Sequence, residues 1–244
     1  MSSSIQLLLA ASALALASVV GGATGFAASL LSTPFLLLVG LDVPSVVVVN
    51  LSATLVSRLE VLWRRRRAID RRRVGLLLAG SAPGAVAGAF TVGYLDPHVL
   101  KIAAGVVVAV LGVVLLLRRP RDGPTPGTAS YTTAGVVGGF LSTSISLNGP
   151  PVAVVLNRAR LSPDSFIADF AGYFVLTNTI SLAVLGIHGR IPTALLWPAL
   201  PVLLVAALIG NRTGAQLTDR IPQRAFRTTV DVLVVLTGIA TVLT

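Results

Sequence analysis

Long apolar segments repeat along almost the whole chain, and they constrain the fold more than any other feature. Short stretches rich in Pro, Gly or charge separate them. The segments lie at residues 5–39, 44–63, 74–95, 99–117, 131–157, 165–186, 192–210 and 226–243. Only 11% of the residues are charged, against about 25% in a soluble domain. Since apolar stretches of this length are typical of membrane helices, the sequence predicts an all-α polytopic membrane protein.

The chain divides into similar halves around a Pro/Gly-rich stretch, residues 118–130, which we predict to be a linker. The motif "GGATGFAASLLSTP" at 21–34 resembles "GGFLSTSISLNGPP" at 138–151. We therefore expect two transmembrane repeats, residues 1–117 and 131–244, with four apolar segments each. Internal repeats are typical of secondary transporters, which bind substrate where the repeats meet.

The first segment of each half is unusual. Residues 5–39 would form a helix about 50 Å long, whereas the hydrocarbon core of a membrane is about 30 Å thick. Small and polar residues interrupt both 5–39 and 131–157. Each is therefore either one kinked span or a re-entrant hairpin, which returns to the side from which it entered.

Basic residues favour the hairpins. Single spans would place eleven basic residues on one side of the membrane and seven on the other, whereas hairpins place sixteen on one side and only Lys101 and Arg190 on the other. The second distribution fits the positive-inside rule. The sequence thus predicts two inverted repeats, each a broken re-entrant hairpin plus three transmembrane helices. Both termini would lie outside and the Arg-rich loop 64–73 in the cytoplasm.

The two interruptions predict a binding site. Broken backbone in a membrane is tolerated only where protein buries it or a cavity hydrates it. Helix N-termini and hydroxyl groups attract anions, and Gly allows close approach to the backbone. We expect the breaks to meet near the midplane and bind a small anion. The candidate substrate-binding residues are Thr24, Ser32, Thr33, Asn50, Ser52, Ser142, Thr143, Ser144, Ser146, Asn148, Gly149 and Asn178. The alternative is that these hydroxyls satisfy local carbonyls or hold helices together.

Three charged residues within the predicted spans are candidates for binding the substrate charge or for proton coupling: Arg58, Asp169 and Asp231. Ionisable groups inside a membrane are functional candidates by default. Ordinary ion pairs are the alternative, because Glu60 and Arg64 are four residues apart and would meet on one helix surface.

Several classes of function lack support in the sequence. The chain has no Cys and only two His, and neither His has clustered partners for a metal ion. We find no phosphate-binding loop, zinc protease motif or nucleophile elbow, so we expect no cofactor and no enzyme activity. The basic run between two apolar segments is explained by topology rather than by nucleic-acid binding. The expected partners are a small anionic substrate, the lipid bilayer and, as a further hypothesis, a second copy of the chain.

Three stretches resemble the TauE/SafE family, exporters of sulfite and organosulfonates in bacteria and archaea. They are "GGATGFAASLLSTPFLLLVGLDVPSVVVVNLSATLVS" at 21–57, "GSAPGAVAGA" at 80–89 and "GVVGGFLSTSISLNGPPVAVVL" at 135–156. The resemblance implies a secondary transporter in the plasma membrane of a prokaryote that exports sulfite or an organosulfonate. The alternatives are a membrane-embedded partner subunit and an intramembrane enzyme.

Overall fold

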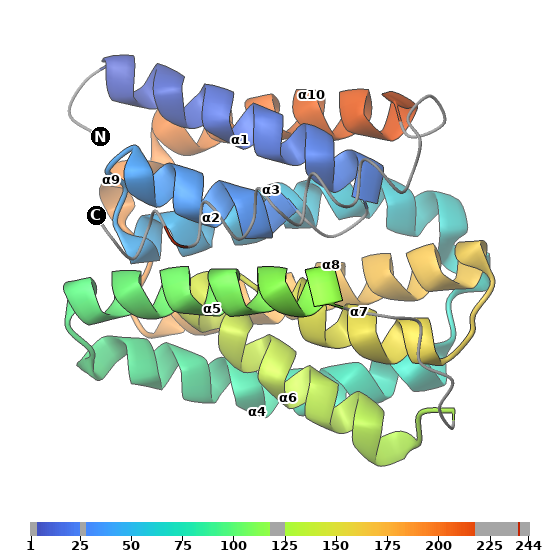
Figure 1. The fold of residues 1–244 in the computed structure, drawn as a ribbon. Helices are drawn as coiled ribbons and strands as arrows, with labels where there is room; N and C mark the ends of the chain where they lie inside the picture. The colour runs from blue at the N-terminus through green and yellow to red at the C-terminus, as the bar shows by residue number, and fades with distance from the viewer. Residues whose placement is uncertain (1–3, 25–27, 118–124, 218–238, 240–244) are drawn as a thin grey trace. The chain divides into compact units, whose positions relative to one another are not determined.

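The computed structural model describes residues 4–24, 28–117, 125–217 and 239, and within these ranges the chain forms helices and no strand. The helices are α1 (Ser4–Thr24), α2 (Ala28–Leu38), α3 (Val43–Arg65), η1 (Arg66–Ala68), α4 (Arg71–Tyr94), α5 (Pro97–Leu117), α6 (Thr128–Ile145), α7 (Gly149–Arg158), α8 (Pro163–Ile187), α9 (Thr193–Leu196) and α10 (Ala199–Leu217). Figure 1 shows them along the chain.

The helices follow the predicted apolar segments, although all of the segment 226–243 except residue 239 lies outside the described residues. Within the part of the chain that the structure describes, four helices are long and apolar enough to cross a membrane: residues 4–23, 43–68, 71–94 and 164–187. The prediction of an all-helical membrane protein is thereby confirmed. The inverted repeats and the count of eight segments stay predictions.

Contacts within the chain define two compact units. Unit 1 comprises the described residues of Met1–Ala53, Leu95–Arg119 and Ile191–Thr244, and unit 2 those of Thr54–Tyr94 and Pro120–Arg190. Each unit therefore draws on both halves of the sequence.

In unit 1, α1 packs along α10 (Figure 1). Gly210 and Gly214 lie one turn apart on α10, and a Cβ added at either would overlap with a backbone carbonyl of α1, that of Ala15 or Val19 respectively. The two helices therefore approach as closely as their backbones allow. This spacing of small residues is typical of close helix packing in membranes.

In unit 2, α4 and α6 pack in the same way (Figure 1). Gly80 and Gly84 of α4 face carbonyl oxygens of α6, and Gly135 and Gly139 of α6 face carbonyl oxygens of α4. A Cβ at any of these four positions would overlap with the facing backbone. The glycines thus fix how α4 and α6 cross, and α6 ends at the polar break described below.

The long first segment of each half forms two helices. Gln6 Nε2 donates to the carbonyl oxygens of Val39 and Gly40, both at 3.3 Å, so the start of α1 lies beside the end of α2. The two helices therefore run antiparallel. In unit 2, α7 turns back along α6 (Figure 1). The interruption predicted at "GGATG", residues 21–25, reaches the end of α1: Gly21 and Gly22 lie within this helix, and residues 25–27 lie outside the described part of the chain.

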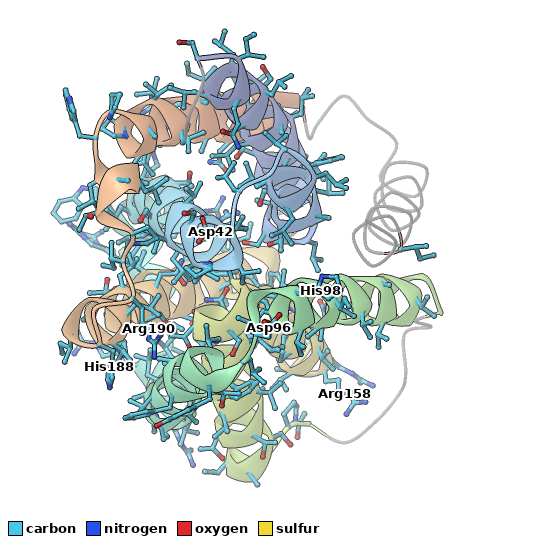
Figure 2. All side chains as sticks on the ribbon, turned by 90° about the vertical axis from the view of Figure 1, so that its left-hand side faces the viewer. Asp42, Asp96, His98, Arg158, His188 and Arg190 are labelled. Carbon is cyan, nitrogen blue, oxygen red and sulfur yellow. The ribbon has the colours of Figure 1, made fainter. Side chains whose placement is uncertain are left out.

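The residues that follow α8 pack against the end of α4. The His188 ring meets Phe90 edge to face, with ring centroids 4.8 Å apart. The Arg190 guanidinium lies where a side chain at Gly93 would be. Figure 2 labels His188 and Arg190 on this connection. Among the described residues, no group of His, Asp and Glu could hold a metal ion.

Candidate substrate site

The break in unit 2 has an ordered backbone. Helix α6 ends at Ile145, and Ser146 takes a left-handed conformation with φ 59°, which residues with a side chain seldom adopt. Helix α7 begins at Gly149, followed by Pro150 and Pro151. Proline suits a helix start because its missing N–H has no partner there in any case. Two of the N–H groups that a helix start offers to an anion are therefore absent. An anion at this break would depend mainly on hydrogen bonds from side chains.

Four side chains gather at this break, and we call Ser142, Asn148, Asn178 and Ser181 the Asn148 cluster. Asn148 Nδ2 donates to Asn178 Oδ1 at 2.7 Å and, more weakly, to Ser142 Oγ at 3.5 Å. The Ser142 and Ser181 hydroxyls are 2.9 Å apart. All four residues are at most 2% exposed. The cluster thus joins α6, the break and α8 in one buried hydrogen-bonded group without a carboxylate.

A second polar pair links α4 to α8. Ser81 Oγ donates to Thr177 Oγ1 at 3.1 Å, and both residues are fully buried. On α8, Tyr173, Thr177 and Ser181 are spaced by four residues and share a face. Ser81, Ser181 and Tyr173 were not among the predicted site residues. The spacing of Tyr173, Thr177 and Ser181 along an otherwise apolar segment was the signal that could have revealed the two on α8.

Other predicted hydroxyls at the break are bonded to nearby carbonyls. Thr143 Oγ1 donates to the Ala85 carbonyl at 2.8 Å. Ser144 and Ser146 donate to carbonyls of their own segment at 2.7 and 2.6 Å. Their observed bonds match the alternative raised from the sequence, in which hydroxyls satisfy carbonyls and hold helices together.

Unit 1 contains a smaller polar group. Asn50 accepts from Ser32 Oγ at 2.7 Å and donates through Nδ2 to Thr33 Oγ1 at 3.0 Å. All three residues are at most 2% exposed. Ser52 is half buried and lies two positions further along α3, which places it on the opposite side of the helix from Asn50. Thr24 is the last residue of α1, and its side chain lies outside the described part.

Asp169 is fully buried and bound at the start of α4. It accepts from Arg73 Nε at 2.6 Å and from the Asp70 backbone N–H at 2.7 Å. Arg73 also pairs with the Asp70 carboxylate at 2.8 Å. The pKa of the Asp70 carboxyl group is lowered, chiefly by a hydrogen bond from the Arg73 backbone N–H. The charge on Arg73 and a hydrogen bond from the Arg72 backbone N–H lower it further. Asp169 therefore holds the loop before α4 against α8.

The remaining charged candidates differ in surroundings. Arg58 is buried on α3 with its guanidinium 6.0 Å from the centre of the Phe174 ring. Glu60 and Arg64 form the expected exposed pair at 2.8 Å. Asp231 lies outside the described residues.

Apolar spans, closely packed glycine helices and a buried amide and hydroxyl cluster at a broken helix are together typical of a membrane transporter. The family model of the sulfite exporter TauE/SafE matches residues 9–241. The chain belongs to the TauE/SafE family, as its motifs predicted.

Two curated relatives are similar to the chain. The "Probable sulfite/organosulfonate exporter TauE" of Cupriavidus necator is 26% identical over 59% of this chain and 59% of its own length. The "Probable inner membrane transporter protein TsaS" of Comamonas testosteroni is 27% identical over 71% of this chain and 73% of its own length. The chain thus aligns with about three fifths of the first relative. No solved structure matches it. Family and relatives support a membrane transporter rather than an enzyme.

Proposed function

We propose that this chain exports a small oxyanion of the sulfite and organosulfonate class, and that the Asn148 cluster contacts it. The observation that carries the proposal is the buried, uncharged group of amides and hydroxyls at a broken helix. Membership of the TauE/SafE family and the names of the two relatives supply the substrate class. The proposal places the protein in a prokaryotic plasma membrane.

The chemistry of the Asn148 cluster suits such an anion. Sulfite and sulfonates present several oxygens that accept hydrogen bonds, and Ser and Asn supply donors. A hydrogen bond to a charged group contributes about 1.5–3 kcal/mol, against about 0.5–1.5 kcal/mol for a neutral pair. An arriving oxyanion can therefore replace the internal bonds from Asn148 to Asn178 and between the two serines at a net gain. The Gly149 N–H at the start of α7 adds a backbone donor.

We extend the proposal to the group of Ser32, Thr33 and Asn50 in unit 1. There, as at the Asn148 cluster, an Asn side chain is bonded to hydroxyls beside a Pro-containing helix. Replacing Asn50 with Leu removes both bonds while keeping the branched arrangement of side-chain heavy atoms. We expect it to weaken anion binding by about tenfold, as loss of one hydrogen bond to a charge would. Unchanged binding would assign this group to packing.

Helix packing supports two repeats. In the predicted repeats, α1 and α6 begin each half, whereas α4 and α10 occupy equivalent later places. The glycine contacts join α1 to α10 and α6 to α4. The first helix of each half therefore packs against the equivalent later helix of the other half. The antiparallel pair α1 and α2 is of the kind that a re-entrant hairpin requires.

The proposed topology has both termini outside and residues 64–73 in the cytoplasm. The chain has no Cys, so single cysteines can be introduced without background labelling. We expect a membrane-impermeant reagent to label position 98 or 188 from outside and position 66 only from inside. Labelling of position 98 only from inside would overturn this topology.

Arg58, Asp169 and Asp231 are the proposed groups for substrate charge or proton coupling. The pairing of Asp169 with Arg73 offers a structural role as well, and Asp169→Asn separates the two. If Asp169 couples protons, the variant exchanges anion across the membrane but no longer responds to a pH gradient. If Asp169 only holds the loop, the variant melts at a lower temperature and still responds.

Proteoliposomes containing the purified full chain test the function directly. We expect counterflow of radiolabelled sulfite, sulfoacetate or thiosulfate, reduced about tenfold or more in Asn178→Leu. Thr179→Val is the matched control, because the Thr179 hydroxyl on the same helix donates to its own Val175 carbonyl at 2.7 Å. Absence of counterflow for all three anions would favour a partner subunit, and chemical conversion of an anion would favour an enzyme.

A further inference from the structure

The Tyr173 side chain in unit 2 combines complete burial with an unused polar atom. Tyr173 is 0% exposed, and among the described residues its hydroxyl has no hydrogen-bond partner. The Ser81 and Thr177 hydroxyls lie near the phenol oxygen but are bonded to each other, at 3.1 Å, and neither completes a hydrogen bond with Tyr173. Buried polar groups in native structures nearly always have a partner, so one without a partner calls for an explanation.

The phenol points to the break between α6 and α7. Its oxygen lies against Gly138 of α6, where an added Cβ would overlap with it. The same Cβ position is 3.2 Å from the carbonyl oxygen of Asn148, the residue that precedes α7. Gly138 therefore leaves the space that the phenol occupies. The hydroxyl thus lies beside the Asn148 cluster but outside its hydrogen bonds.

The aromatic residues that neighbour Tyr173 on α8 are phenylalanines, which pack in the core without a hydroxyl. Phe166, Phe170 and Phe174 lie on the same helix and form a continuous series of ring contacts, with centroids 5.4 and 4.8 Å apart. A Phe at 173 would fill nearly the same volume without burying a hydroxyl. Because an unpaired buried hydroxyl is unfavourable, packing alone does not account for the Tyr.

We propose that the Tyr173 hydroxyl donates a hydrogen bond to the transported oxyanion, and that Gly138 is glycine so that the phenol can reach it. This inference rests on the proposed function. The phenol is a neutral donor at physiological pH, and an oxyanion beside Asn148 supplies the acceptor that the described residues do not. Tyr173 then contributes to the choice of oxyanions over neutral solutes.

Tyr173→Phe separates this role from a structural one. If the hydroxyl serves the ligand, removing it leaves the melting temperature of the ligand-free protein unchanged or raises it. The Kd for sulfite or sulfoacetate then rises about tenfold or more. If the hydroxyl is bonded within the protein, the variant melts lower. Tyr131→Phe is the control, since Tyr131 is buried on the first turn of α6 in the same unit.

A double-mutant cycle with Gly138 tests the geometry. Gly138→Ala forces the phenol away from the break and should weaken sulfite binding when Tyr173 is present. In the Tyr173→Phe background the overlapping oxygen is gone and the contact at 3.2 Å with the Asn148 carbonyl oxygen remains, so Gly138→Ala should have a much smaller further effect. The inference would be overturned if Gly138→Ala weakened sulfite binding by the same factor with and without the Tyr173 hydroxyl. It would also be overturned if the Tyr173→Phe variant bound sulfite as tightly as the wild type. If the wild-type protein binds neither sulfite nor sulfoacetate, the proposed function itself fails.

Discussion

The pair Asn148 and Asn178 gives the sharpest test of the Asn148 cluster. Their amides are 2.7 Å apart, and the residues are 2% and 0% exposed, so water cannot replace a lost partner. Leu has the same branched arrangement of side-chain heavy atoms as Asn, with a larger volume and no polar group. Asn148→Leu or Asn178→Leu alone therefore leaves the other amide buried with this bond broken, at a cost of about 1–3 kcal/mol.

The double substitution leaves neither amide behind. We expect Asn148→Leu with Asn178→Leu to cost clearly less than the sum of the two single changes, with a coupling of about 1 kcal/mol or more. Unfolding of the purified protein in detergent measures all four free energies. Additive costs would show that these amides are not coupled.

Transport should respond in the opposite way. The double variant regains part of its stability, yet it has lost both amides that would contact the anion. We therefore expect its counterflow of sulfite to be at least as low as that of either single variant. A double variant that is stable and transports at the wild-type rate would refute the assignment of the Asn148 cluster to the substrate.

Three further predictions concern other parts of unit 2. Gly84→Leu should prevent α4 and α6 from packing, because even a Cβ at this position overlaps with the facing backbone. Fluorescence size-exclusion chromatography should then show little folded protein in the membrane, and a yield near that of the wild type would contradict this packing. Ser144→Ala should leave counterflow within about twofold of wild type, since the loss of a hydroxyl bonded to its own helix is a small change. The lowered pKa of Asp70 means that its ionised form stabilises the fold above the ordinary Asp pKa, and that this contribution is lost as the pH falls through the folded-state value. Asp70→Asn should therefore lower the melting temperature at neutral pH, and its difference from wild type should shrink on acidification.

The sequence by itself determined the features that depend on neighbours along the chain. Apolar segments of sufficient length predicted helices, and the series "STSISLNGPP" predicted the break that separates α6 from α7. The Glu60 and Arg64 pair followed from helical spacing alone. These predictions succeeded because both depend on residues close together in the sequence. Backbone groups in a membrane must form hydrogen bonds within their own helix, and the helical repeat fixes which neighbours share a face.

Only the tertiary structure decided which polar groups of the break meet one another. Ser142 and Thr143 are adjacent in sequence, yet one joins Ser181 across to α8 and the other bonds to a carbonyl of α4. The environments of Tyr173 and Asp169 likewise depend on how α8 is rotated against α4 and α6. Glycine contacts between backbones set the crossing of α4 and α6, against which α8 packs, and the partner of each side chain therefore depends on positions far away in the chain.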